Sequence, residues 1–102
     1  MNTELLGRLR TLPDVEERPS QFHGEPAFWI EGREFVHFHG DQWIELRLTG
    51  KLINRLDDER AMRRARTSDW VTVETRHIDL VVDLARQALE ANRRGGRQTR
   101  TP

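Results

Sequence analysis

The chain has 102 residues, of which 35% are hydrophobic and 33% are charged, and it contains no cysteine. A chain of this length forms one domain around a small core. The absence of cysteine excludes disulfides, thiol nucleophiles and cysteine-based zinc sites. No apolar stretch approaches the roughly 20 residues needed to cross a bilayer, and the first residues lack the pattern of a secretory signal. We therefore expect no membrane span and a cytoplasmic location.

Positive and negative charges balance, but the arginines are unevenly distributed. The 17 lysines and arginines match the 17 aspartates and glutamates, so the overall field does not favour nucleic acid as a partner. One cluster comprises Arg60, Arg63, Arg64 and Arg66, and it is kept as an alternative nucleic-acid surface. Because no aromatic residue is interleaved with it, a solvated loop is the favoured interpretation. We expect residues 1–94 to form a single domain and residues 95–102 to form a disordered basic tail.

Apolar residues at helical spacing predict three helices. They lie at residues 3–12, around 52–56 and around 80–89. Thr3 is the expected N-cap of the first helix, and Pro13 ends it. The glycine pair that begins at Gly95 ends the last helix. The charged segment 59–68 resists assignment, with an extra helical turn through Met62 as one option.

Alternating residues and glycine turns predict a mainly antiparallel sheet. The segments "AFWI", "EFVHFH" and "QWIELRL" follow one another across short turns that contain glycine. A short strand at Ser20–His23 is expected before them, and "DWVTVET", residues 69–75, adds a strand after the second helix. We therefore expect an α+β fold with four to five strands, helices on one face, and the order α-β-β-β-α-β-α.

The hairpin "FVHFHGDQWIELRL", residues 35–48, indicates its own register. A three-residue turn at 40–42 pairs Phe38 with Ile44 and gathers the aliphatic residues on one face, whereas a two-residue turn mixes the faces. The same register places Phe35 on the polar face, opposite an arginine. That polar face holds the candidate binding residues His37, His39, Trp43, Glu45 and Arg47, with Trp70 from the later strand. Two tryptophans on an accessible face favour a pocket or a partner contact.

The polar face permits two kinds of chemistry besides simple binding. His37 and His39 point the same way on a strand, and Glu45 opposite them could complete a divalent-metal site of two histidines and one carboxylate. The pattern resembles the first half of a cupin motif, but the spacing differs and the second motif is missing. His37 with Glu45 could instead serve acid and base chemistry, although no nucleophile or known catalytic motif accompanies them.

The favoured function is therefore binding of an unidentified ligand or protein partner, without a cofactor. A metal-binding protein or a small enzyme that uses His37, His39 and Glu45 is the alternative, and the sequence leans against an enzyme. It does not identify an oligomeric state.

Several stretches together resemble a known family. They are "RPSQF", "AFWIEGREFVHFHG", "IELRLTGKLINRL", "SDWVTVE" and the closing "DLVVDLARQALEANRR". They are similar to small bacterial and fungal proteins called the luciferase-like domain, which have no established activity, and "HFHG" and "SDWV" are the most specific pieces. The family name implies light-producing chemistry, but no flavin phosphate loop or adenylate-forming motif accompanies it. The order of elements is also similar to the double-wing proteins of the MmcQ/YjbR type, which is an analogy of fold alone.

Overall fold

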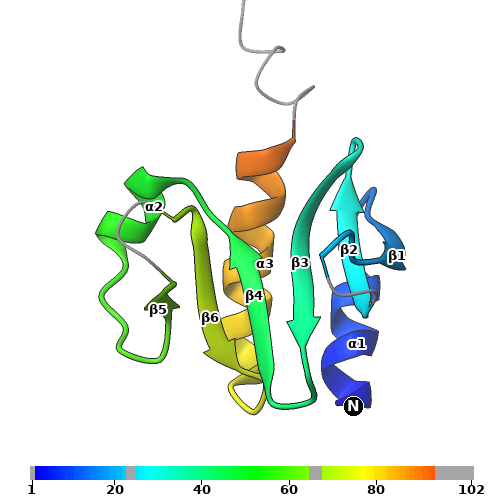
Figure 1. Ribbon diagram of the computed structural model, residues 1–102, viewed down its shortest axis with the longest axis horizontal. Helices are drawn as coiled ribbons and strands as arrows, with labels where there is room; N and C mark the ends of the chain where they lie inside the picture. The colour runs from blue at the N-terminus through cyan, green and yellow to red at the C-terminus, as the bar shows by residue number, and fades with distance from the viewer. Residues whose placement is uncertain (1, 23–24, 65–67, 94–102) are drawn as a thin grey trace, which may run out of the picture.

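A six-stranded sheet forms the frame of the protein (Figure 1). The computed structural model describes residues 2–22, 25–64 and 68–93. In chain order the elements are α1 (Thr3–Arg10), β1 (Glu16–Pro19), β2 (Pro26–Ile30), β3 (Arg33–His39), β4 (Trp43–Arg47), α2 (Gly50–Arg55), β5 (Met62–Arg63), β6 (Trp70–Glu74) and α3 (Ile78–Asn92). The strands lie in the order β1-β2-β3-β4-β6-β5, and every neighbouring pair is antiparallel. The predicted α+β class and element order are confirmed, but the sheet has six strands rather than the predicted four to five, and the short strands β1 and β5 account for the difference.

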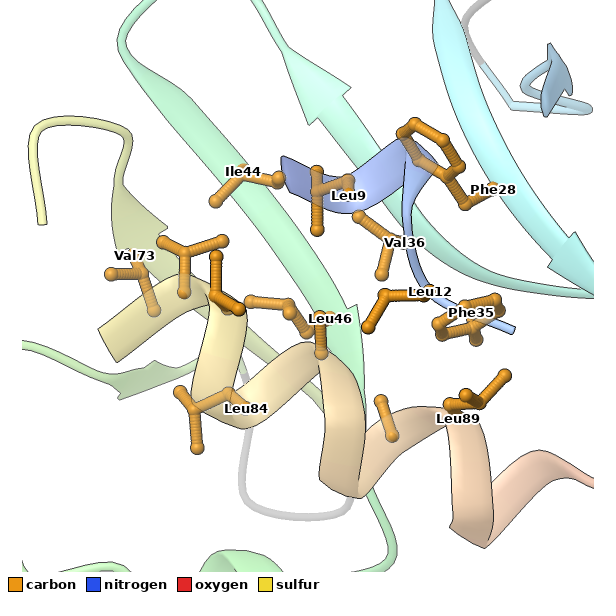
Figure 2. Close-up of a cluster of buried hydrophobic side chains, with 14 of the residues drawn as sticks. Leu9, Leu12, Phe28, Phe35, Val36, Ile44, Leu46, Val73, Leu84 and Leu89 are labelled. Carbon is orange, nitrogen blue, oxygen red and sulfur yellow. The ribbon is translucent and has the colours of Figure 1, made fainter. Parts of the chain in front are cut away.

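The aliphatic core lies between the sheet and the helices α1 and α3, which cover one face (Figures 1 and 2). The four residues that the predicted register assigns to this core are all fully buried: Val36, Phe38, Ile44 and Leu46. Ile53 of α2 joins the same core. The helices therefore leave the other face of the sheet to the polar side chains.

The helices match their predicted positions, with one correction at the first N-cap. Asn2 caps α1 in place of Thr3, because the Asn2 side-chain oxygen accepts a hydrogen bond from the Leu5 N–H at 3.0 Å. The longest described helix, α3, has 15 residues. Within the described ranges, no helix is both long and apolar enough to cross a membrane. The predicted stop at Gly95 and the predicted tail lie outside the described residues.

The strand predicted at residues 20–23 is wrong for the part that the structure describes. The strand β1 comes earlier, Ser20 lies outside any strand, and Gln21 and Phe22 form a turn, while His23 lies outside the described residues. The physical reason is local, because the N–H groups of Gln21 and Phe22 bond to side chains rather than to a neighbouring strand. A side chain that captures backbone donors in this way competes with a strand ladder.

The helical turn suggested through Met62 is also wrong. Met62 and Arg63 form the short strand β5 instead, paired with Thr72 and Val71 of β6. The charged segment is therefore tied to the edge of the sheet.

The turn between β3 and β4 has the three residues that the sequence predicts. His39 lies opposite Trp43, and His37 lies opposite Glu45. Gly40 has φ +75°, a left-handed conformation that glycine adopts without strain. The register predicted from the separation of polar and aliphatic residues is confirmed.

A β-bulge in β3 changes which side chains share a face. Between residues 28–29 of β2, the paired position in β3 moves from Val36 to Glu34, which leaves Phe35 as an extra residue. The predicted place of Phe35 on the polar face is therefore wrong. Its ring is fully buried in the core (Figure 2), and Glu34 takes its place beside His37.

Candidate functional site

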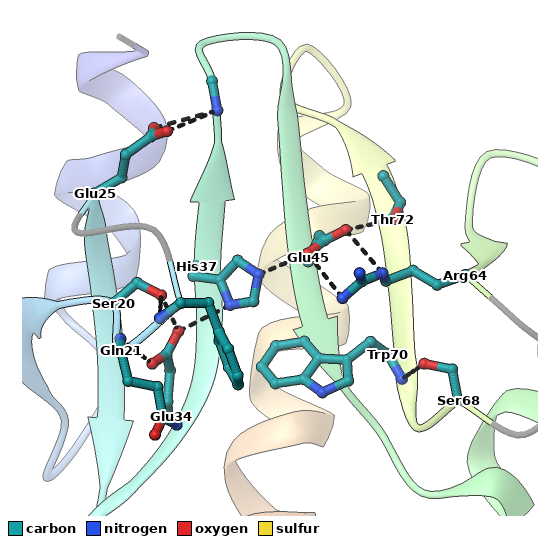
Figure 3. Close-up of polar contacts among 12 residues, drawn as sticks. Ser20, Gln21, Glu25, Glu34, His37, Glu45, Arg64, Ser68, Trp70 and Thr72 are labelled. Carbon is teal, nitrogen blue, oxygen red and sulfur yellow. Dashed lines mark hydrogen bonds and ion pairs between the residues drawn. The ribbon is translucent and has the colours of Figure 1, made fainter.

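Three buried ionisable side chains form a row across strands β3 and β4 (Figure 3). His37, 1% exposed, lies in the middle. Its Nε2 is 2.6 Å from Glu45 Oε1, and its Nδ1 is 2.8 Å from Glu34 Oε2. The Nε2 contact with Glu45 is a hydrogen bond, and the Nδ1 contact with Glu34 lies within ion-pair distance. We call Glu34, His37 and Glu45 the buried triad.

The inner end of the buried triad is held by the turn that follows β1. Glu34 accepts a hydrogen bond from Ser20 Oγ at 2.6 Å and another from the Gln21 N–H at 2.9 Å. Ser20 Oγ in turn accepts from the Phe22 N–H at 3.0 Å. A buried carboxylate needs such donors, because burial without them is strongly unfavourable. Glu34 therefore fastens residues 20–22 to the sheet.

The outer end of the buried triad is bound less tightly. Glu45 Oε2 accepts from Thr72 Oγ1 at 3.2 Å, and the Arg64 guanidinium reaches the two carboxylate oxygens at 3.4 and 3.5 Å. The Arg64 side chain is 52% exposed, whereas that of Glu45 is 7% exposed. Hydrogen bonds of this length are weak compared with the 2.6 Å contact to His37. Arg64 is thus the loosest partner of Glu45.

Two aromatic rings cover His37 on its outer side. The Trp70 ring centroid lies 4.6 Å from that of His37, and the Phe22 ring centroid lies 5.5 Å from it. Phe22 and Trp70 meet edge to face at 6.2 Å. Phe22 comes from the turn held by Glu34, so the same contact that satisfies the carboxylate also places this ring over the histidine.

A hollow of about 420 Å³ opens beside the outer end of the buried triad. It is lined by His39, Trp43, Glu45, Met62, Arg63, Arg64 and Thr72. Arg63 is held in its wall by bonds to the Ser68 carbonyl at 3.0 Å and to Asn54 Oδ1 at 3.4 Å. The hollow therefore combines two arginines, one carboxylate and apolar surface from Trp43 and Met62.

The structure divides the six predicted surface residues among different roles. Three of them line the hollow: His39, Trp43 and Glu45. His37 lies buried beneath the face, and Trp70 packs over it. Arg47 lies farther along β4, opposite Trp70, and is not part of the lining.

Sequence reasoning missed Glu34, Ser20 and Phe22. Strict alternation from Val36 puts Glu34 in the aliphatic core and Phe35 on the polar face. That double mismatch was the available signal of a bulge, because one extra residue corrects both positions at once. Ser20 and Phe22 carry no comparable signal, since they reach the site through a turn.

A comparison with known protein families identifies the family of the chain. A model of the Luciferase domain matches residues 32–91, which is more than half of the chain. The chain belongs to this family. The match confirms the similarity expected from the sequence and includes all three members of the buried triad. No match was found among curated proteins, and the double-wing analogy stays a prediction.

The metal alternative for this Luciferase domain gains no support from the geometry. Both ring nitrogens of His37 lie against carboxylates, and His39 is exposed at the end of β3. Across residues 2–22, 25–64 and 68–93, no three or more His, Cys, Asp or Glu side chains are arranged to hold a metal ion.

The described arginines of the alternative nucleic-acid surface each contact a partner within the Luciferase domain. Arg63 and Arg64 lie in the hollow, as described above, and Arg66 lies outside the described residues. Arg60 bonds to Asp58 at 2.6 and 2.9 Å. This hydrogen bonding lowers the pKa of Asp58 to about 2.

Replacing Arg60 with glutamine is expected to return the Asp58 pKa toward its ordinary value of 3.8. Because the folded-state pKa is lowered, the pair stabilises the protein fully above pH 3.8, and this stabilisation is lost as the pH falls toward 2. An NMR titration of the Asp58 carboxyl measures the change. Arg86→Gln, on α3, is the matched control and should leave the titration unchanged. An Asp58 that titrates identically in the Arg60 variant contradicts the assignment.

Proposed function

We propose that this Luciferase domain binds a small molecule that carries a carboxylate or phosphate and an apolar portion. The hollow beside Glu45 is the proposed site. Its main support is the lining, in which arginines and apolar side chains meet on the face that α1 and α3 leave uncovered. Its volume lies within the range of about 300 to 1,000 Å³ that is typical of small-molecule sites, and its lining supplies both charged and apolar groups.

The charges around the hollow favour an anionic group on the ligand. Glu45 already contacts His37 at 2.6 Å and Arg64 at 3.4 Å. Arg63 bonds to two neutral acceptors, a backbone carbonyl and an asparagine oxygen, so those bonds leave its charge without a counterion. The planar guanidinium is well suited to carboxylate and phosphate groups.

The apolar part of the ligand is expected to lie against Trp43 and Met62. Met62 is a large apolar side chain that is 48% exposed on β5, and Trp43 is half-buried on β4. Covering such surface is favourable by about 25 cal/mol per Å². Methionine also adapts its shape to different ligands.

Binding of phenylacetate and phenyl phosphate, with benzyl alcohol as the neutral comparison, tests the proposal. In NMR titrations, both anions are expected to shift the amide signals of residues 43 and 62–64. Losing one charge-assisted hydrogen bond weakens binding by about 1.5 to 3 kcal/mol, or roughly 10- to 100-fold. Arg63→Gln should therefore weaken the binding of both anions to this extent, whereas Arg86→Gln should leave it unchanged. Equal binding of benzyl alcohol, or shifts confined to α3, would overturn the proposal.

A further inference from the structure

We infer that Glu45 exchanges a proton with a carbon acid bound in the hollow, so that the domain catalyses keto–enol interconversion of a small anionic carbonyl compound. This inference rests on the proposed binding function, since the substrate must occupy the same hollow. Glu45 is the catalytic residue. His37 and Glu34 are positioning residues, because they act through Glu45.

The buried triad is an unusual way to build a sheet face. Burying charges is costly, and well-packed apolar residues in place of a buried ion pair are often neutral or stabilising. Here three ionisable side chains are buried in a row, and the outer one, Glu45, forms part of the wall of the hollow. Both features fit a carboxylate that is held in one orientation for use at its exposed end.

Arg64 links ligand binding to the availability of Glu45. Its contacts with Glu45 are 3.4 and 3.5 Å long, and half of its side chain is exposed. An anionic ligand competes for the same guanidinium. When Arg64 turns toward the ligand, Glu45 keeps its contacts with His37 and Thr72, and Oε2 becomes accessible from the hollow.

The proton transfer then balances in atoms and charge. A C–H bond next to the ligand carbonyl breaks, and its proton forms an O–H bond with Glu45 Oε2. The electron pair of the C–H bond forms the C=C bond of an enolate, and the carbonyl oxygen takes the negative charge near Arg64. Delivery of the proton to that oxygen gives the enol, and its return to carbon restores the ketone. No oxidant or reductant is consumed.

The surroundings of Glu45 fit this step. The carboxyl group is buried against His37 and approached by Arg64, and two arginines line the hollow in which the enolate charge develops. In a poorly solvated site, such positioned groups stabilise a developing charge strongly.

Deuterium exchange into two carbonyl probes tests the inference. Phenylpyruvate supplies a carboxylate and dihydroxyacetone phosphate supplies a phosphate, and both carry acidic C–H bonds. In D₂O, the protein is expected to accelerate loss of the ¹H NMR signal of those bonds for at least one probe. Glu45→Gln should reduce the acceleration by about 100-fold or more while the probe still shifts the amide signals of residues 43 and 62–64, because the amide oxygen still accepts from His37. Arg86→Gln should behave as wild type.

A second variant separates positioning from general stability. Glu34→Gln, outside the lining of the hollow, should lower the maximal exchange rate without changing KM, because it disturbs the contacts behind Glu45 and leaves the lining residues in place. An unchanged maximal rate overturns the role of Glu34. A probe that binds without accelerated exchange, or acceleration that survives in Glu45→Gln, overturns the proton transfer and leaves the binding function standing. Absence of both binding and exchange overturns both.

Discussion

Replacing His37 with leucine is expected to lower the free energy of unfolding by about 3 to 5 kcal/mol. The substitution removes the group that lies between two buried carboxylates, at 2.6 Å from one and 2.8 Å from the other. Leucine fills a similar volume, so the loss reports mainly the two buried carboxyl groups that lose their partner rather than a cavity. Urea unfolding followed by circular dichroism measures the change.

The matched control for this variant lies on the same strand. His39→Leu changes the same residue type two positions away, where the side chain is exposed, and its cost is expected to stay below about 1 kcal/mol. Adding Glu34→Gln and Glu45→Gln to His37→Leu should recover part of the loss, because neither amide carries a charge. A cost below about 1 kcal/mol for His37→Leu itself contradicts a stabilising role of the contacts between His37 and the two carboxyl groups.

Replacing Phe35 with alanine is expected to cost about 3 to 5 kcal/mol, the usual range for emptying a phenylalanine site in a core. The bulge in β3 places this ring, fully buried, between the sheet and the helices. On the polar face beside Arg47, as strict alternation predicts, the same substitution would cost less than about 1 kcal/mol. Chemical denaturation therefore distinguishes the two placements.

Phe22→Ala is the control of matching residue type. The Phe22 ring is 58% exposed where it covers His37, so its removal should cost clearly less than that of Phe35. Costs below about 1 kcal/mol for both variants would show that Phe35 does not occupy the core.

Much of the fold was predictable because one face of the sheet is buried. With a side-chain period of two, only one register puts Val36, Phe38 and Ile44 together, and the structure adopts that register. The bulge could not be predicted in the same way, because it interrupts the alternation of side chains on which the prediction of register depends. The sequence did contain a sign of the bulge, namely the adjacent residues Glu34 and Phe35. Each of them conflicts with the face that alternation assigns to it.

For the candidate site, the sequence predicted which residues share a face of the sheet but not which of them are buried. The hairpin alone brings His37, His39, Trp43 and Glu45 to one face. Which of them is buried is decided by segments far along the chain, namely the turn that carries Phe22 and the arginine that follows β5. Arg64 contacts Glu45 across 19 positions, and Trp70 reaches His37 from β6. Such contacts depend on how loops close, which local periodicity does not report.

The contacts from Ser20 to Thr72 link the turn after β1 with the strands β3, β4 and β6 (Figure 3). These side-chain contacts therefore help to fix the register of the strands, in addition to the backbone hydrogen bonds between them. Sliding β4 by one residue along β3 would draw Glu45 away from His37 and turn a carboxylate toward the aliphatic side. Each wrong alignment separates the buried carboxyl groups from their partners and also mismatches the apolar faces, so the polar face contributes specificity to the fold.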